Sequence, residues 1–293
     1  MKSACRRPLP TVVLSMLLLS ACGSSPESPG GTGNVGYAGV RSSSYGVDPF
    51  PDPAGWASCI SIMADAFPGS SPCALWIVGT VDESIQGVNL EFPSPGGSYP
   101  NISFSDSDMH EEYFAWFDDC GIEVFLQVEP GFADVPTVIG LVLDNYADHP
   151  CVTGFGVDVE WFGNVTEGGE GMPVDDSTAG SWEALVTYYD PGYGLFLKHW
   201  DPAFMPPSYR GDLIFVDDGQ GYSNMEEYLA DMAAWAEEFD PNRVFFQYGY
   251  DSDSTWWGSL GFAPVDIGEA LAAQTPQECG LFWVDFNLDE LQR

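Results

Sequence analysis

Positive charge is scarce in this chain. Its 293 residues include 44 aspartates and glutamates but only 8 lysines and arginines, which gives a formal net charge of −36. Such a surface repels phosphate backbones and anionic head groups, so we do not expect the protein to bind nucleic acid. Because 45% of the residues are hydrophobic and 14% are aromatic, the composition is that of a folded chain rather than a disordered one.

Long apolar runs are also missing. The run at residues 11–19 is too short to span a membrane. It follows three basic residues and ends in Leu-Ser-Ala-Cys, the order of a secretory signal. That ending resembles the bacterial lipobox, which implies removal of residues 1–21 and a lipid anchor on Cys22. No aspartate follows Cys22, which by resemblance to Gram-negative sorting patterns favours the outer membrane.

The segment that follows the signal has little regular patterning. Residues 22–44 are rich in glycine, serine and proline, so we expect a flexible tether there. Without residues 1–21, five basic residues face 44 acidic ones, a formal net charge of −39. Residues 45–293 are enough for one large core and have about the size of a single α/β barrel. We therefore expect one domain there, in a monomer that touches the membrane only through its lipid.

Short β-runs alternate with helical segments through residues 45–293. The expected strands cover residues 45–50, 74–81, 122–129, 154–161, 195–200, 213–217, 244–248 and 281–285. The expected helices cover residues 54–66, 108–120, 135–148, 177–188, 225–239 and 264–273. Alternating strands and helices imply a parallel sheet. Eight strands in a domain of about this size predict a closed (β/α)8 TIM-type barrel, an α/β fold.

Besides Cys22, five cysteines remain in the exported domain, and their spacing is unlike that of a zinc site. We assign no metal and no cofactor. An exported location permits disulfides. Cys120 and Cys151 each precede an expected strand, so they should share one end of the barrel and could pair. Cys59 could pair with Cys73 or with Cys279.

Polar and aromatic side chains gather at the carboxyl-terminal ends of the expected strands, where barrel enzymes build their sites. The alternative is that every strand ends in polar residues where it meets water. Rings beside carboxylates suit a sugar, because a pyranose stacks its C–H face on aromatic rings and offers hydroxyls to polar groups. The candidate binding residues for a polysaccharide or oligosaccharide are Gln127, Glu129, Lys198, Trp200, Asp217, Gln247, Tyr248, Tyr250, Trp283 and Asp285.

Two acids stand out within the apolar run at residues 152–161. Asp158 and Glu160 are two positions apart, so their side chains should lie on the same side of the strand. Buried together, they would keep a proton on one carboxyl near neutral pH and provide a general acid. The alternative is a strand end at which both acids meet water.

This run resembles the fourth-strand signature of the family 18 glycoside hydrolases, the chitinases and endo-β-N-acetylglucosaminidases. The family pattern is Asp-Gly-x-Asp-x-Asp-x-Glu. Gly154, Asp158 and Glu160 match it, whereas Thr153 and Gly156 replace its first two aspartates. The resemblance is confined to about ten residues. It implies a glycosidase in which Glu160 protonates the glycosidic oxygen, its pKa raised by burial and by Asp158.

The same resemblance implies that the substrate's N-acetyl oxygen attacks the anomeric carbon while Asp158 orients the acetamido group. Tyr248 or Tyr250 would assist the carbonyl, and Trp283 would lie under the sugar. For a substrate without an N-acetyl group a second carboxylate is needed, and the candidates are Glu129, Asp217 and Asp285. The lost aspartates leave open a non-catalytic lipoprotein that binds a glycan without cleaving it.

Lys198 is the only lysine of the exported chain. It could neutralise neighbouring acids, bind a substrate carboxylate or hydroxyl, or act as a desolvated amine that forms a Schiff base.

Overall fold

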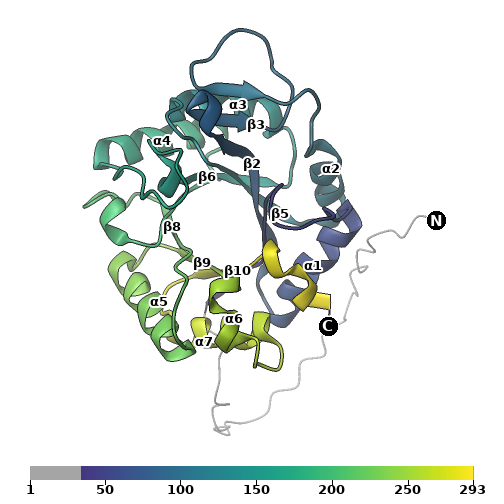
Figure 1. Ribbon diagram of the computed structural model, residues 1–293, viewed down its shortest axis with the longest axis vertical. Coiled ribbons are helices and arrows are strands. Elements are labelled where there is room, and N and C mark those ends of the chain that lie inside the picture. Colours follow the sequence, from purple (N-terminus) through teal and green to yellow (C-terminus); the bar gives the residue numbers. More distant parts are fainter. Residues whose placement is uncertain (1–33, 293) are drawn as a thin grey trace, which may run out of the picture. The chain divides into compact units, whose positions relative to one another are not determined.

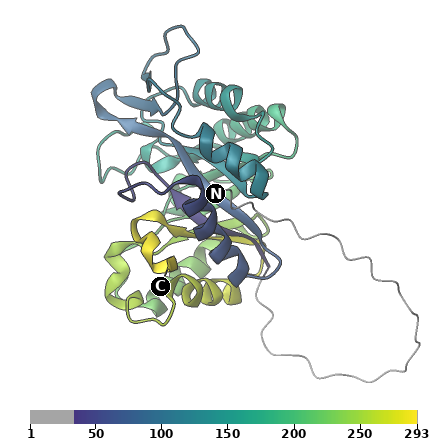
Figure 2. The same ribbon diagram turned by 90° about the vertical axis from the view of Figure 1, so that its right-hand side faces the viewer.

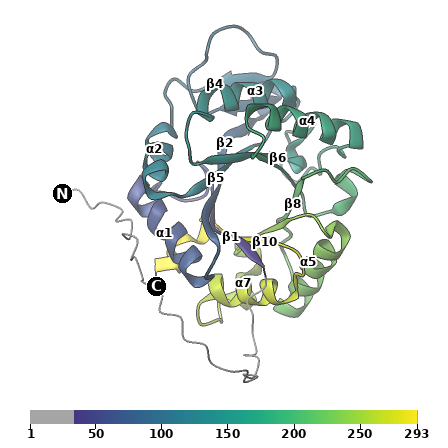
Figure 3. The same cartoon turned by 180° about the vertical axis from the view of Figure 1, so that it is seen from behind.

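The computed structural model describes residues 34–292, and within them the chain forms the predicted closed (β/α)8 barrel. Eight parallel strands surround the centre in the order β1-β2-β5-β6-β7-β8-β9-β10, and β1 closes the ring by pairing with both β2 and β10. Figure 1 looks along the barrel, and Figure 3 shows β1 beside β10 from behind. The strands are β1 Val35–Ser42, β2 Ser71–Asp82, β5 Glu123–Val128, β6 Val152–Asp158, β7 Gly194–Lys198, β8 Ile214–Asp217, β9 Val244–Tyr248 and β10 Cys279–Val284.

Helices cover the outside of the barrel (Figure 1). They are α1 Pro53–Ala66, α2 Glu111–Cys120, α3 Val135–Tyr146, α4 Asp176–Tyr189, α5 Met225–Phe239, α6 Ser254–Trp257 and α7 Ala263–Gln274. The carboxylates of Asp52, Asp134 and Asp175 cap the first turns of α1, α3 and α4. In α5 the side-chain oxygen of Asn224 accepts the Glu227 N–H at 2.9 Å. All six expected helices are present, with boundaries that differ by a few residues.

The first strand lies earlier in the chain than expected. Residues 45–50 form no strand, and β1 occupies residues 35–42, inside the expected tether. The prediction failed because β1 is built from small residues: Gly39 packs so closely on β2 that an added Cβ would lie 1.7 Å from the Cys73 carbonyl oxygen. The barrel domain therefore begins by Val35. The expected signal peptide, the lipidated Cys22 and residues 22–33 of the tether lie outside the described residues.

A small extension interrupts the strand–helix alternation after β2, and the sequence did not reveal it. Strand β3, Gly87–Leu90, pairs antiparallel with the end of β2, and β4, Ile102–Phe104, pairs parallel with β3. In Figure 2 the barrel is seen from the side, with α1 and α2 toward the viewer. None of the helices within residues 34–292 is long and apolar enough to cross a bilayer.

Alternate residues of each strand fill two separate cores, as the pleat requires. The barrel interior contains a compact cluster of buried side chains: Cys73, Leu75, Phe125, Phe196, Ile214, Val216, Phe245 and Phe282. A larger apolar layer lies between the strands and the helices. The interior is thus plugged by aromatic rings at mid-height, and polar inward-facing residues lie above them at the carboxyl-terminal strand ends.

The expected disulfides are not formed. Cys59, Cys73, Cys151 and Cys279 are free, buried thiols, so neither the Cys120–Cys151 pair nor a pair with Cys59 exists. The barrel explains part of this outcome. Cys73 faces the interior, whereas Cys59 and Cys279 lie in the outer apolar layer.

Candidate functional site: a carboxylate cluster around Lys198

Lys198, the last residue of β7, is surrounded by three carboxylates. Its ammonium lies 2.8 Å from Asp158 Oδ2, 2.8 Å from Glu160 Oε1 and 2.5 Å from Asp218 Oδ2. The Lys198 side chain is only 5% exposed. The Gln127 amide also donates to Asp158 Oδ2 at 3.2 Å. We call these five residues the Lys198 cluster.

The barrel geometry brings these residues together. Asp158 and Lys198 are direct neighbours in the β6–β7 register. Glu160 lies beyond the strand in a short 3-10 turn, Val159–Trp161, and not on the strand as expected, but it still contacts Lys198, so the two acids converge. Asp218 comes two residues after Val216, which faces the barrel interior. Four neighbouring strands, β5 to β8, thus each send a polar group to one point.

Protons are distributed unequally over the Lys198 cluster. Burial raises the pKa of Asp218 to about 7, and the adjacent Glu160 charge adds to that rise. Burial also raises the pKa of Asp158 well above its ordinary value, against the opposing effect of Lys198. One carboxyl of the cluster therefore keeps a proton near neutral pH beside an ionised neighbour, which is an arrangement that acid–base catalysis requires.

The pKa of Glu160 is lowered, whereas the sequence predicted a raised pKa. Burial on its own would raise the pKa of Glu160, but the Lys198 charge and hydrogen bond lower it to about 2. The sequence prediction of a raised pKa failed because it did not place a lysine between the two acids. Glu160 is nevertheless the most solvent-accessible acid of the cluster, with a side chain 25% exposed against 2% for Asp158 and 6% for Asp218.

Lys198 itself is held in its charged form. Burial would lower its pKa, but Asp158, Asp218 and Glu160 raise it well above the ordinary value. This geometry favours charge neutralisation over Schiff-base chemistry, because a nucleophilic amine must be deprotonated.

The barrel interior leaves no room for a side chain at Gly156, where the signature that this run resembles has an aspartate. A Cβ added to Gly156 would lie 1.9 Å from the ring of Phe196, which fills the barrel interior. An aspartate there would displace the ring. Gln127 and Lys198 hold Asp158 instead. At position 153, the Thr153 hydroxyl donates to the Val124 carbonyl at 3.3 Å.

A second charged network lies at the ends of β10, β1 and β5. Arg41 donates to Asp285 Oδ1 at 2.8 Å and to the Tyr45 hydroxyl at 2.6 Å. That hydroxyl in turn donates to Glu129 Oε1 at 2.5 Å. The amide and hydroxyl of Ser43 both donate to Asp285 Oδ2. Burial raises the pKa of Glu129.

Sequence reasoning assigned no role to four residues of these networks: Arg41, Ser43, Tyr45 and Asp218. The scarcity of basic residues could have indicated Arg41. In so acidic a chain, an arginine within a run of small residues is expected to pair with buried acids. Asp218 could have been predicted from strand alternation, because it lies two residues after Val216 and so should face the same side. Nothing in the sequence indicates that Tyr45 reaches Glu129 across the barrel end.

Several buried polar atoms at the strand ends have no hydrogen-bond partner within residues 34–292. They include three acceptors, Asp158 Oδ1, Asp218 Oδ1 and Gln127 Oε1, and one donor, Gln247 Nε2. The Gln247 carbonyl oxygen accepts from the Tyr250 hydroxyl at 3.2 Å. Buried polar groups are seldom left unpaired, so these atoms are available to bind water or a polar ligand.

Three predicted binding residues lie outside the barrel interior. Tyr248 is buried in the outer apolar layer, and its hydroxyl donates to the Pro264 carbonyl at 2.7 Å. Trp283 packs in the same layer. Asp217 follows inward-facing Val216 and raises the pKa of the α5 residue Tyr228. Neighbours in a strand point to opposite sides, so Gln247 and Tyr248 cannot share one site. The structure does not bring these three residues to the Lys198 cluster.

Apolar side chains are exposed around the same end of the barrel. Of the seven large exposed apolar side chains within residues 34–292, six lie on loops that follow strands. These are Tyr45, Met109, Phe132, Met172, Trp200 and Phe286. Tyr45 and Phe286 flank Arg41, whose guanidinium lies 5.1 Å and 5.2 Å from their ring centres. Trp200 is 43% exposed beside buried His199.

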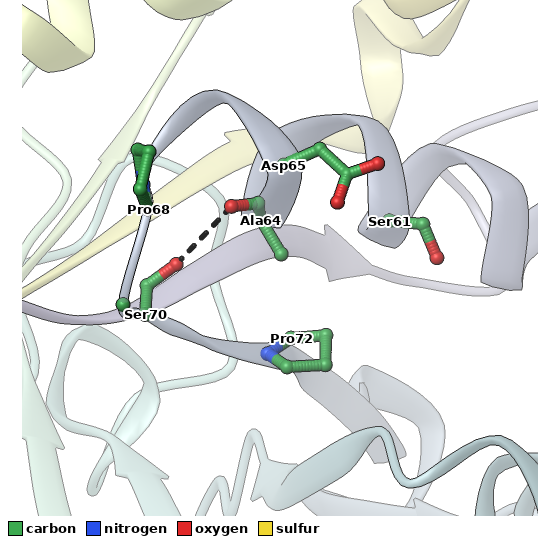
Figure 4. A pocket seen from close by; sticks show the side chains of 7 residues that line it. Ser61, Ala64, Asp65, Pro68, Ser70 and Pro72 are labelled. Atoms are coloured by element: carbon green, nitrogen blue, oxygen red, sulfur yellow. Dashed lines mark hydrogen bonds between the residues drawn. The ribbon is translucent and has the colours of Figure 1, made fainter. Parts of the chain in front are cut away.

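A separate pocket lies away from this site (Figure 4). It is lined by the end of α1 and the start of β2, including Asp65, Ser70 and Pro72. This is the amino-terminal end of the barrel, opposite the Lys198 cluster. With one carboxylate and mostly small side chains, the pocket offers no comparable chemistry.

The fold and these two networks define a (β/α)8 barrel protein with an acidic, lysine-centred site at the carboxyl-terminal strand ends. No protein-family model matches the chain, and no curated protein sequence matches it.

Proposed function

We propose that this protein is a glycoside hydrolase-like surface lipoprotein that cleaves a β-linked, N-acetylated glycan. The observation that carries the proposal is that Glu160 and Asp218 both contact the Lys198 ammonium, at 2.8 Å and 2.5 Å. Asp218 has a pKa of about 7, and Glu160 is ionised and more exposed. Both lie at the end of the barrel where this fold places its active sites.

In the proposed mechanism the two carboxyls share one proton. Glu160 contacts the substrate because it is the exposed member, and the proton held by Asp218 passes through it to the departing glycosidic oxygen. Asp218 is left as a carboxylate, which Lys198 stabilises. Because the two groups interact strongly, their titrations belong to the pair rather than to either residue alone.

Asp158 orients the acetamido group in this proposal. Its Oδ1 atom is buried and unpaired within the described residues, so it is suited to accept the acetamido N–H. The acetamido oxygen then attacks the anomeric carbon, which removes the need for a separate protein nucleophile.

The surroundings of the Lys198 cluster support a sugar ligand. Tyr45, Trp200 and Phe286 are exposed rings on the strand-end loops, and such rings can stack on pyranose faces. Five acids and two cations make up the two networks, so the negative charge disfavours uronic-acid polymers. The acids are Glu129, Asp158, Glu160, Asp218 and Asp285, and the cations are Arg41 and Lys198.

One observation favours the second candidate, a non-catalytic glycan-binding lipoprotein. The Lys198 contact lowers the pKa of Glu160 to about 2, and a carboxylate fixed in that state binds hydroxyls but donates no proton. In both candidates the protein is held at the outer membrane by a lipid on Cys22.

A glycan screen tests the proposal. The unlipidated chain that begins at residue 23 is incubated with chito-oligosaccharides, peptidoglycan fragments and plain β-glucans, and new reducing ends are measured. We expect cleavage of an N-acetylated glycan, its loss in Glu160→Gln, and retention in Glu237→Gln, which changes an exposed helix residue. Binding without cleavage by the wild-type chain would instead support the second candidate.

A further inference from the structure

We propose a zinc site formed by Asp118, His149 and Cys151 at the amino-terminal end of the barrel. Asp118 lies near the end of α2, and His149 and Cys151 lie in the loop between α3 and β6. One ligand atom from each residue lies within 4.8 Å of those of the other two. This group is separate from the Lys198 cluster, so the inference does not depend on the proposed function.

The hydrogen bonds around His149 resemble those of a metal ligand. Its Nε2 lies 3.1 Å from Glu111 Oε2, and its Nδ1 lies 2.7 Å from Asp118 Oδ2. Metal-bound histidines generally donate their second ring N–H to a carboxylate, which fixes the ring. Glu111 fills that role and leaves Nδ1 facing the other two ligands. Glu111 and Asp118 are seven residues apart on α2 and so lie on the same face of the helix.

The other two ligands are also fixed in place. The Cys151 backbone N–H donates to Asp118 Oδ1 at 2.7 Å, which orients the carboxylate and leaves Oδ2 toward His149. The Cys151 thiol is buried, lies 3.6 Å from the Phe114 carbonyl and also interacts with the Asp118 carboxylate. The thiol is therefore already beside another of the proposed ligands.

The donor set selects the metal. One thiolate, one imidazole and one carboxylate suit zinc, whereas calcium and magnesium prefer oxygen ligands alone. Three protein ligands leave one tetrahedral position for water. The side chains of His149 and Asp118 are 14% and 21% exposed, so a cation can enter from solvent. Binding displaces the Cys151 thiol proton and the proton between His149 and Asp118, and both are released to solvent.

Calorimetric titration with zinc chloride tests the site in the unlipidated chain that begins at residue 23. Excess magnesium occupies the acidic surface during the titration. We expect one zinc per chain, and a melting temperature raised by roughly 5–10 °C at a hundredfold excess over Kd. Cobalt should produce a thiolate-to-metal charge-transfer band.

Three variants make the test specific. Cys151→Ser should lose the cobalt band and weaken zinc binding at least tenfold, and His149→Ala, which changes a half-buried side chain, should weaken it similarly. Cys59→Ser removes another buried thiol and should change neither. Zinc binding that survives both site variants, or alkylation showing that Cys151 carries no free thiol, would overturn the proposal.

Discussion

Removing the charge of Lys198 should destabilise the barrel strongly and in a pH-dependent way. Lys198→Met leaves Asp158, Glu160 and Asp218 buried together without the cation that each contacts at 2.5–2.8 Å. Deleting one partner of a buried ion pair costs roughly 3–5 kcal/mol, because the remaining charge is left uncompensated. We expect a loss of that size in the free energy of unfolding at pH 8.

The loss should shrink as the pH falls. Without Lys198 the pKa of Glu160 rises from about 2, so the folded variant takes up protons that the wild-type cluster does not need. At pH 5 the carboxyls are largely neutral and no longer repel one another. The destabilisation should therefore fall to less than half of its value at pH 8.

Arg243→Met is the matched control. Arg243 also forms an ion pair, 3.4 Å from Asp212, but the Asp212 side chain is 86% exposed. Such pairs contribute about 0–1 kcal/mol. Urea unfolding of both variants and the wild-type chain at pH 5, 6.5 and 8 measures the difference. Equal effects of the two substitutions, or a Lys198→Met loss that is independent of pH, would refute the reasoning.

Three further predictions concern single positions. Asp218→Asn should abolish hydrolysis, and the wild-type rate should decline above pH 7 as Asp218 loses its proton; a rate that is constant up to pH 9 would argue against its role. The folded chain keeps that proton, whereas the unfolded chain loses it near the ordinary pKa of 3.8. The free energy of unfolding should therefore fall by about 4 kcal/mol as the pH rises from 3.8 to 7. Urea unfolding of Asp218→Asn should lack this pH dependence. Gly156→Ala should cost about 1–3 kcal/mol by overpacking against Phe196. In the same assay Gly140→Ala, whose added Cβ would lie 3.8 Å from the nearest atom, should stabilise the chain by about 0.5–1 kcal/mol, because alanine favours the helix α3 more than glycine does. Asn224→Ala should remove the α5 cap and cost about 1 kcal/mol in thermal unfolding, and an unchanged midpoint would contradict that assignment.

The sequence predicted the architecture well because the strand and helix periodicities are strong. Seven of the eight barrel strands and all six expected helices are where the patterns place them. The first strand was not predicted because its glycines and serine resemble those of a linker. At Gly39 the close packing on β2 leaves no room for a larger residue. The β3–β4 extension was missed because its strands are too short to show a period.

The candidate site was predicted in composition but not in detail. Asp158 and Glu160 do converge on Lys198, although Glu160 lies in a 3-10 turn beyond the strand and not on the strand as expected, and Lys198 does neutralise its neighbours. The direction of the pKa shift of Glu160 could not be predicted, because it depends on the contact with Lys198, and no local sequence pattern indicates that contact. Tyr248 and Trp283 were misplaced by counting strand-end residues without following the pleat.

Carbon-13 NMR titration of the side-chain carboxyls tests the central claim most directly, because it observes the protons of the Lys198 cluster without assuming a substrate. Comparison with Asp218→Asn identifies the signal of Asp218. The account predicts one carboxyl that titrates near pH 7 in the wild-type chain and is missing from the variant, with Glu160 ionised down to about pH 2. If Asp218 instead titrates near its ordinary value of 3.8, it holds no proton at neutral pH, and the proposed acid–base pair of Glu160 and Asp218 does not exist.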